Sequence, residues 1–579
     1  MSAPKPPPQR PPAPLTPALA SLLNDGYQHQ LRGQYEEAAR AYRKILKVAP
    51  DQADVIHLLG VVRARQGREA EAIELYLKAA RRKPGDPKIV YNLALAYGAA
   101  RREAEALEAM AQAFALDPAL PLAANLLFPA RRAAWDWRDH DRLVDNLKRG
   151  ALGQSAPTLP MLLLQSVDDP ALHLACARRT VEAEKMVARP LSPAPRRGRE
   201  GPIRVAYVSA DFRIHPTTHL IAALLEGHDR ARFEVTAISI GPDDGSPERA
   251  RMAGAVDRFL DRRTASAQEI AQEVAQLGID VLVDLMGHTQ GERMEIFAHR
   301  PAPVQVGFLG YPGTSGAPFF DYVIADPVVL PFSEAAHYSE KIVHLPDCYQ
   351  PNDPELPVGA TPGRAAFGLP DDAFVFACFN SASKLDPAVF SSFARIVSAV
   401  PGSVLWMYEG RGGGADTLRR EAERRGLDPA RLVFAPQVPL GDHLARLLHA
   451  DLFIDTFPYT AHTTASDALR MGLPVVTRSG RSFASRVAAS LLRQVKLDDL
   501  VTQDAAAFEA TATALAREPD RLAAVRARLA AALPGTPLFD VARYTRHLEQ
   551  AYATMVARMR AGQAPEAFAV APVADATDA

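Results

Sequence analysis

Two histidines, His215 and His219, stand four residues apart in the stretch SADFRIHPTTHLIAALLEG. Such a pair could ligate a metal ion, move protons, or belong to the start of a helix. A zinc site needs three or four ligands, but no glutamate lies between the histidines and the sequence offers no third ligand nearby. Pro216 suits the first position of a helix, which makes His215 roughly its cap. We therefore predict no metal here and a His215 ring that faces a cleft, kept neutral by the nearby helix N-terminus.

A second group of polar residues follows two apolar runs further along the chain. In YTAHTTASDALRMG, Thr463 and Thr464 would occupy the first turn of a helix, with Asp467 one turn on. Lys384 follows the run FVFACFN in the segment NSASK. Exposed N–H groups at a helix start bind anions, and a lysine adds a full positive charge. Alone, Thr463 could be a simple helix cap and Lys384 a surface lysine, but their conjunction predicts a diphosphate cradle.

These residues can meet only if the fold places them at the ends of neighbouring strands. From residue 202 onward, short runs rich in Val and Ile alternate with helical patterns. The strand-like runs form two series: IRVAYVS, RFEVTAISI, IDVLVDL, VQVGFLG and DYVIA, then FVFACFN, SVLWMYE, RLVFAP, LFIDT and PVVTR. This alternation predicts two doubly wound parallel-sheet domains. Such sheets bind ligands beyond the carboxyl ends of their strands, where both polar groups are expected.

The front of the chain repeats itself. GQYEEAARAYRKILKVAP, GREAEAIELYLKAARRKP and RREAEALEAMAQAFALDP align without gaps. Gly33, Gly67 and Arg101 recur at a period of about 34 residues, which is typical of the tetratricopeptide repeat. Small alanines let paired helices approach closely, Tyr42 and Tyr76 fill the gap, and a proline ends each unit. We predict three such repeats, with a concave face that binds a peptide or another subunit.

The composition limits the class of protein. Of the 579 residues, 48% are hydrophobic and 23% are charged, which is typical of a multidomain globular protein. Lys and Arg number 66 against 67 Asp and Glu, so no bulk nucleic-acid binding is expected, and no apolar run is long enough for a membrane span. Three sparse cysteines without metal-binding spacing favour a reducing, cytoplasmic setting.

The predicted fold class is α plus α/β, with helical repeats followed by two doubly wound parallel sheets. A disordered Pro-rich leader (1–15), the repeats (16–118) and a helical linker region (119–200) come first. Two α/β halves follow (201–357 and 358–536), of which the second is expected on the nucleotide side. A C-terminal helix (537–562) and a disordered tail (563–579) end the predicted order.

Six longer motifs lie between about residues 202 and 560: YVSADFRIHPTTHLI, DLMGHTQGERMEIFAHRPAPVQVGFLGYPGTSG, FNSASKLDP, SVLWM, HTTASDALRMGLPVVT and FASRVAASLL. On these motifs the chain resembles the protein O-GlcNAc transferases, in a bacterial form. That family has the GT-B glycosyltransferase fold behind N-terminal tetratricopeptide repeats. The resemblance implies transfer of N-acetylglucosamine from UDP-GlcNAc to Ser and Thr hydroxyls of protein acceptors, with inversion and without a metal or other cofactor.

The same resemblance implies roles for individual residues. Lys384 would bind the donor diphosphate and stabilise the departing UDP, while His215 and Asp211 match two residues proposed as the general base. The implied donor- and substrate-binding set comprises Pro216, Thr217, Leu309, Gly310, Ser381, Val438, His443, His462, Thr463, Thr464 and Asp467. Within this set, His443 would stack on uracil and Asp467 would bind the ribose.

The chain departs from the animal members of that family at four places near the donor. Leu440 replaces a ribose-binding lysine and Ser381 replaces a glutamine. His288 and Gln290 replace a tyrosine and a lysine. These changes leave the sugar open, so O-fucosyl transfer from GDP-fucose stays an alternative. A tetratricopeptide adaptor with an inactive transferase domain is another.

Overall fold

The computed structural model describes residues 14–120, 123–191, 201–410 and 413–573. The chain divides into two compact units, one formed by residues 1–130 and 139–147 and the other by residues 131–138 and 148–579. Most of the predicted leader, residues 192–200 of the linker region and residues 574–579 of the predicted tail lie outside the described residues. None of the described helices is both long and apolar enough to cross a bilayer.

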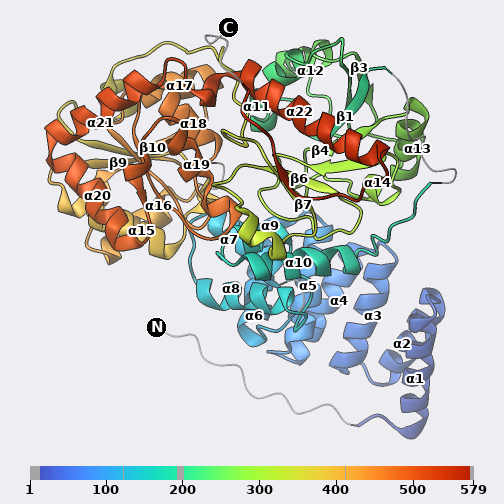
Figure 1. The fold of residues 1–579 in the computed structure, drawn as a ribbon. Helices are drawn as coiled ribbons and strands as arrows, with labels where there is room; N and C mark the ends of the chain where they lie inside the picture. The colour runs from blue at the N-terminus through green and yellow to red at the C-terminus, as the bar shows by residue number, and fades with distance from the viewer. Residues whose placement is uncertain (1–13, 121–122, 192–200, 411–412, 574–579) are drawn as a thin grey trace. The chain divides into compact units, whose positions relative to one another are not determined.

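The first unit contains three helix pairs. Its helices are α1 (Pro17–Leu31), α2 (Tyr35–Val48), α3 (Ala53–Arg65), α4 (Glu69–Arg82), α5 (Pro87–Ala99) and α6 (Glu103–Leu116). α1 packs against α2, α3 against α4 and α5 against α6, and each pair contacts the next (Figure 1). This is the stacked array that the sequence period predicts.

A tyrosine in each of the first two repeats reaches a glycine in the preceding helix. Tyr42 and Tyr76 are buried, and a Cβ added at Gly26 would come within 2.8 Å of the Tyr42 ring. A Cβ added at Gly60 would come within 2.7 Å of the Tyr76 ring. Only glycine allows the paired helices to approach this closely. The tyrosines are gap fillers, as predicted, but their glycine partners were not predicted from the sequence.

The second unit contains two parallel sheets, each flanked by helices. The first half consists of β1 (Ile203–Ser209), α11 (Pro216–Glu226), β2 (Phe233–Ser239), α12 (Pro247–Gly254), β3 (Arg258–Asp261), α13 (Ala267–Leu277), β4 (Val281–Asp284), α14 (Glu295–Ala298), β5 (Val304–Gly307), β6 (Tyr322–Ala325) and β7 (Lys341–His344). Its sheet has the order β14-β7-β6-β5-β4-β1-β2-β3, in which β14 (Phe568–Ala569) comes from the C-terminal segment. The winding direction reverses between β1 and β4, which places a crevice at their carboxyl ends.

The second half follows the same plan. It consists of β8 (Val375–Cys378), α15 (Pro387–Ala399), β9 (Val404–Tyr408), α16 (Ala415–Arg424), β10 (Leu432–Ala435), α17 (Leu440–Leu447), β11 (Leu452–Ile454), α18 (Thr463–Arg470), β12 (Val475–Arg478), α19 (Val487–Gln494), β13 (Val501–Thr502), α20 (Ala505–Arg517) and α21 (Pro519–Ala532). The sheet order is β10-β9-β8-β11-β12-β13, with the reversal between β8 and β11.

The predicted fold of two doubly wound parallel sheets is confirmed. Every strand-like run of the sequence forms a strand, and the neighbouring strands pair in parallel. The sequence patterns miss β3, β7, β13 and β14, which span only two to four residues each. β13 and β14, with two residues each, are too short to show an alternating pattern. β3 buries none of its four residues at the edge of the sheet, so it lacks the apolar run of the other strands.

Four helices stand between the repeats and the first sheet in chain order. They are α7 (Ala123–Ala133), α8 (His140–Ala151), α9 (Pro160–Leu164) and α10 (Pro170–Ala183). Asp168, between α9 and α10, accepts hydrogen bonds of 2.8 Å from the N–H groups of Arg481 and Ser482 in the second half. A Cβ added at Gly316 of the first half would come within 2.5 Å of the backbone of α10. The segment α9–α10 therefore contacts both halves of its unit.

The C-terminal segment returns to the first half. α22 (Val541–Arg560) packs Leu548 and Tyr552 into the apolar core of the first sheet, which it crosses in Figure 1. β14 (Phe568–Ala569) then pairs with β7. The prediction of a disordered tail from residue 563 is therefore wrong for this stretch, because Phe568 contacts the core and its backbone extends the sheet.

A buried carboxylate fixes α22 to the first half. Glu549, 3% exposed, accepts hydrogen bonds from Nδ1 of His228 at 3.0 Å and from the N–H of Asp229 at 2.8 Å. The other ring nitrogen of His228 lies 2.9 Å from the hydroxyl of Tyr207 on β1. Three buried polar side chains thus connect β1, the residues after α11 and α22.

We predict that Glu549→Ala destabilises the second unit by about 2–4 kcal/mol, because it leaves a buried histidine and a backbone N–H without their acceptor. Thermal unfolding followed by circular dichroism measures the loss as a lower midpoint. The matched control is Glu423→Ala at an exposed position of α16, which should leave the midpoint unchanged. Equal midpoints for both variants would show that the buried network adds no stability.

Candidate functional site

The predicted donor residues gather at the reversal point of the second sheet. Lys384 ends the short helix η3 (Ala382–Lys384) after β8, while His462, Thr463 and Thr464 stand at the start of α18 after β11. β8 and β11 are neighbours in the sheet, so both segments leave from the same edge. Open α/β sheets bind their ligands at this kind of edge.

A buried aspartate ties the two segments together. Asp455, directly after β11, accepts hydrogen bonds of 2.7 Å from the Thr477 hydroxyl on β12 and from the N–H of Ala461. It also accepts a bond of 2.9 Å from Asn380, whose amide oxygen accepts one of 2.5 Å from the hydroxyl of Thr464. Burial raises the pKa of Asp455 to about 6, although its hydrogen-bond donors favour the charged form. Asp455 was not predicted from the sequence, where its only signal is a single acid in the apolar run LFIDT.

Lys384 is half-buried against the same loop. Its Nζ donates a hydrogen bond of 2.8 Å to the carbonyl oxygen of Thr460 and lies 4.3 Å from the centroid of the Tyr459 ring. Withdrawal from water lowers the pKa of Lys384 to about 8, and Asp455 acts in the opposite direction. The ammonium group is therefore held in one place by neutral partners, where an anion would favour its charged form.

The start of α18 offers open hydrogen-bond donors. No side chain caps this helix, and within the described residues the N–H groups of Thr463 and Thr464 have no acceptor. The His462 ring stacks on Tyr459 with a centroid distance of 4.6 Å. Burial, together with Lys384, holds the pKa of His462 well below its ordinary value, so the ring is neutral. Phosphate oxygens can therefore bind the free N–H groups beside Lys384.

α17 carries the second histidine of the predicted donor set. Arg446 donates a hydrogen bond of 2.8 Å to Nδ1 of His443, so the proton of the neutral ring is on Nε2. That Nε2 lies 3.9 Å from a carboxylate oxygen of Asp467. Burial lowers the pKa of His443 to about 3 and raises that of Asp467 to about 7. The ring also meets Phe379 edge-on at 5.4 Å, which fixes its orientation.

In the first half, His215 caps α11 as the sequence predicts. Its Nδ1 accepts a hydrogen bond of 3.2 Å from the N–H of Thr217, and Pro216 occupies the first helical turn. Asp211 is buried, and its carboxylate lies 3.5 Å from the same Nδ1. Burial lowers the pKa of His215, while Asp211 acts in the opposite direction. The direction agrees with the prediction of a neutral ring, but its main cause is loss of water rather than the helix start.

The hydrogen bonds of His215 bear on its implied role. Because Nδ1 accepts from the Thr217 N–H, the neutral ring carries its proton on Nε2. In this tautomer the remaining nitrogen is a hydrogen-bond donor and has no free lone pair. The arrangement therefore favours a His215 that donates a hydrogen bond to a substrate oxygen. It disfavours the role of general base that the family resemblance implies for His215. Oδ1 of Asp211 accepts a hydrogen bond of 3.1 Å from Arg213, while Oδ2 faces the His215 ring.

Leu309 and Gly310 form a tight loop after β5. Leu309 has a φ of 68°, in the left-handed region that side chains other than glycine rarely adopt. A Cβ added at Gly310 would come within 1.9 Å of the carbonyl oxygen of Leu285. The loop therefore lies directly on the residues that follow β4, and a side chain at position 310 would push it away.

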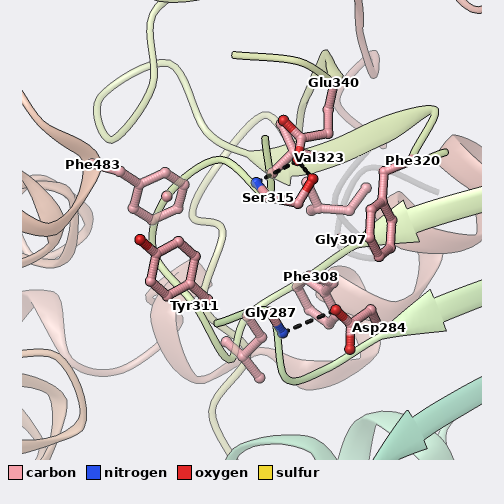
Figure 2. Close-up of a pocket in the computed structure, with 13 residues that line it drawn as sticks. Asp284, Gly287, Gly307, Phe308, Tyr311, Ser315, Phe320, Val323, Glu340 and Phe483 are labelled. Carbon is pink, nitrogen blue, oxygen red and sulfur yellow. Dashed lines mark hydrogen bonds between the residues drawn. The ribbon is translucent and has the colours of Figure 1, made fainter. Parts of the chain in front are cut away.

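A pocket of about 410 Å³ lies at this loop, with walls from both halves. Figure 2 shows Tyr311 of the first half and Phe483 of the second on one side, with Asp284 on another. Asp284 accepts hydrogen bonds of 2.9 Å from two backbone N–H groups, and burial raises its pKa to about 6. Glu340 accepts a bond of 2.7 Å from a backbone N–H. Since both carboxylates already have donors, the pocket offers a ligand mainly aromatic and apolar walls.

A second pocket, of about 390 Å³, also has walls from both halves. Three members of the predicted set line it: Pro216 from the first half, and Thr463 and Asp467 from the second. Val438 and Ser381 lie on neither pocket wall, since Val438 is half-buried before α17 and Ser381 is exposed before η3. The structure thus brings Lys384, His462, Thr463 and Thr464 to one sheet edge, and Pro216, Thr463 and Asp467 to one pocket. Leu309 lines the other pocket, and Val438 and Ser381 line neither.

Comparisons with known proteins agree with this geometry. The sequence profile of glycosyl transferase family 41 matches residues 182–357 and 354–548. The chain belongs to glycosyl transferase family 41. Two tetratricopeptide-repeat profiles match residues 31–87 and 87–120, which confirms the predicted repeats.

The relatives of this family 41 member carry informative names. It is 33% identical over 456 residues to a probable UDP-N-acetylglucosamine–peptide N-acetylglucosaminyltransferase, SEC, of Arabidopsis thaliana, a match that covers 75% of this chain and 47% of the relative. It is 28% identical over 554 residues to the UDP-N-acetylglucosamine–peptide N-acetylglucosaminyltransferase of Caenorhabditis elegans, a match that covers 74% of this chain and 48% of the relative. The chain therefore spans about half the length of these curated relatives.

A solved structure matches nearly the whole chain. A variant of the Thermobaculum terrenum O-GlcNAc transferase is similar with a TM-score of 0.64 and 29% identity, over 94% of this chain and 98% of that chain. The order of repeats followed by two parallel-sheet halves is therefore shared with that enzyme, and the GT-B-like fold is confirmed.

The departures from the animal pattern of family 41 have different structural meanings. Leu440 lines the second pocket, where it contributes an apolar side chain. His288 donates from its Nε2 to the carbonyl oxygen of Ser315 at 2.7 Å, and burial lowers its pKa to about 4. It therefore acts as a neutral structural group. Gln290 is exposed.

The pair His215 and His219 is not part of a ligand cluster among the described residues. Across the described ranges, no group of three or more His, Cys, Asp and Glu side chains is arranged to hold a metal ion. His215 uses Nδ1 within its own helix cap, and His219 lies on the wall of the second pocket. Metal independence of this family 41 member stays a prediction.

We predict that UDP binds this family 41 protein more weakly above about pH 8. Lys384 has a pKa of about 8, so its charge is present below that pH and is lost as the pH rises through it. A bound diphosphate would raise this pKa, so the association constant should fall by up to about tenfold per pH unit above 8. Isothermal titration calorimetry between pH 6.5 and 9 measures the slope.

Lys384→Met provides the matched variant for that titration. It should bind UDP more weakly at pH 7 and show a flatter profile, because the titrating group is absent. If both proteins lost affinity with the same slope, the titrating group would be another residue or the nucleotide itself.

Proposed function

We propose that this member of glycosyl transferase family 41 transfers N-acetylglucosamine from UDP-GlcNAc to Ser and Thr hydroxyls of protein acceptors, with inversion at the sugar. The names of its relatives in Arabidopsis thaliana and Caenorhabditis elegans support this donor and a peptide acceptor. The observation that carries the proposal is the meeting of Lys384 with the uncapped start of α18 at one edge of the second sheet.

The reaction uses that edge to stabilise the leaving group. The acceptor oxygen attacks the anomeric carbon and forms the new C–O bond, while the bond from that carbon to the diphosphate breaks and UDP leaves with its electron pair. Lys384 and the N–H groups of Thr463 and Thr464 face the negative charge that develops on the diphosphate. The hydroxyl proton passes to Asp211 or to a phosphate oxygen of the donor, while Nε2–H of His215 donates to a substrate oxygen.

We also propose that the transfer needs no metal. Fixed positive charge and helix-start dipoles can replace a divalent cation at a diphosphate, and the second half supplies both at the predicted place. Three buried free thiols, Cys176, Cys348 and Cys378, fit a cytoplasmic location, where disulfides rarely form. The concave face of the repeats is proposed to dock an extended segment of the acceptor protein.

We predict that the protein releases UDP from UDP-GlcNAc and labels a Ser- or Thr-containing acceptor protein, and that Lys384→Ala reduces the rate by at least about 10²-fold. The reason is the loss of the preorganised charge at the leaving diphosphate. A panel of UDP-GlcNAc, UDP-glucose and GDP-fucose, followed by nucleotide release and by mass spectrometry of the acceptor, identifies the donor.

The controls separate the parts of this proposal. The matched lysine is Lys341, an exposed side chain at the start of β7 that lines neither pocket, and Lys341→Ala should leave the rate unchanged. Addition of EDTA should also leave it unchanged if no metal takes part. If GDP-fucose were the single donor turned over, the protein would be a fucosyltransferase rather than an N-acetylglucosaminyltransferase. Full activity of Lys384→Ala would refute the assignment of Lys384 to the diphosphate.

We predict that removal of the first two repeats separates acceptor recognition from donor binding. The repeats lie in one compact unit, together with residues up to 130 and 139–147, and every donor-binding residue lies in the other unit. A chain lacking residues 1–84 should therefore bind UDP nearly as well as the full chain, while transfer to a protein acceptor falls much further. Equal losses of nucleotide affinity and transfer would mean that the repeats support the cleft rather than dock the acceptor.

A further inference from the structure

His219 lies one turn beyond His215 on α11, on the wall of the pocket of about 390 Å³ that joins the two halves. The opposite half contributes Thr463 and Asp467 to the same pocket. Thr463 also stands at the uncapped start of α18, so the pocket begins where the proposed diphosphate site ends.

The polar groups of this pocket fall into two classes. Some are mostly paired: Asp353 pairs with Arg251 at 2.5 Å, and the two terminal nitrogens of Arg470 donate to the carbonyl oxygens of Asp353 and Pro354, although its Nε has no acceptor among the described residues. Asn352 donates to the carbonyl oxygen of Leu538 at 3.1 Å. These groups hold the segment between the halves in place and have little left to offer a ligand.

Three other groups remain open. Among the described residues, neither the ring nitrogens of His219 nor the hydroxyl of Thr463 has a hydrogen-bond partner. The carboxylate of Asp467 has no hydrogen-bond donor among the described residues: Nε2 of His443 approaches it to 3.9 Å, and the charge of Arg470 acts to lower its pKa. Polar groups in a pocket that have no protein partner form hydrogen bonds with a ligand or with water. Here they come from both halves, a histidine from one and a carboxylate from the other.

The chemistry of these groups fits the sugar of a nucleoside. A carboxylate can accept hydrogen bonds from hydroxyl groups, and a neutral imidazole can both donate and accept one. Burial lowers the pKa of His219, although Glu248 and Asp353 act in the opposite direction, so the ring is neutral near pH 7. The apolar remainder of the wall, formed by Pro216, Leu220, Leu356 and Leu440, suits the carbon faces of a ribose.

We propose that His219 is a donor-binding residue that hydrogen-bonds a ribose hydroxyl of the nucleotide from the first half, while Asp467 binds the ribose from the second. The inference rests on the proposed function, because it concerns the donor of that reaction. It adds a contact that joins the two halves across the nucleotide.

The test compares ligands that differ by one hydroxyl. Calorimetry with UDP, 2′-deoxy-UDP, 3′-deoxy-UDP and inorganic pyrophosphate is carried out on the full chain, on His219→Phe and on His219→Gln. One neutral hydrogen bond is worth about 3- to 10-fold in affinity. We expect His219→Phe to weaken UDP by that factor and to leave pyrophosphate unchanged, and His219→Gln to restore part of the loss.

The decisive result is a coupling between residue and hydroxyl. One of the two deoxy nucleotides should bind the unaltered chain about 3- to 10-fold more weakly than UDP, and should lose nothing further in His219→Phe. His299→Phe is the matched control, because His299 is half-buried and lines neither pocket. It should change none of these affinities.

Three outcomes would overturn the inference. An equal loss of UDP and pyrophosphate affinity in His219→Phe would indicate a general distortion of the site. The hydrogen bond would be excluded if the deoxy nucleotides bound the unaltered chain as tightly as UDP. It would also be excluded if their loss of affinity relative to UDP were the same in His219→Phe as in the unaltered chain. Failure of the unaltered chain to bind UDP at all would instead refute the proposed function, and with it the donor that His219 was assigned to bind.

Discussion

The candidate site depends on one buried carboxylate, Asp455. It follows the central strand β11 and accepts hydrogen bonds from a neighbouring strand, from its own loop and from Asn380 after β8. Through Asn380 it reaches Thr464 at the start of α18. A carboxylate with this many donors fixes the strand ends relative to each other, and its charge opposes the tendency of Lys384 to lose a proton. Lys384 and α18 could not form a single anion site if the two loops moved independently.

Buried polar contacts of the same kind hold the halves of the second unit together. Asp168 reaches the second half from the helices before the first sheet, and Ser490 of α19 donates to Asp326 at the end of β6 with a distance of 2.6 Å. Arg251 and Asp353 connect α12 to the segment between the halves. Since pocket walls come from both halves, these contacts determine the spacing across which a donor and an acceptor must meet.

The sequence was a good guide to strands, repeats and the residues of the anion site, and a poor guide to how buried groups pair. The apolar runs before Lys384 and before His462 predict strand ends, because a buried strand is recognisable as a run of apolar residues. The tautomer of His215 cannot be predicted from the sequence, since it depends on which donor lies next to Nδ1 after α11 has formed. Asp455, Gly26 and β14 were missed for a related reason: each is explained by a partner distant in the fold, or by a strand too short to show a pattern.

Burial acts differently on Lys384 than on the other ionisable groups of the predicted donor set. His443 and His462 lose their protons and Asp467 tends to keep one, because a charge withdrawn from water is costly without a close counter-ion. Lys384 experiences the same pressure, yet its pKa of about 8 leaves it mostly protonated at pH 7. A diphosphate placed beside it would favour the charged form further. Affinity for the donor is therefore set mainly by the phosphates, whereas the choice of base and sugar rests on neutral hydrogen bonds and on the shape of the pocket walls.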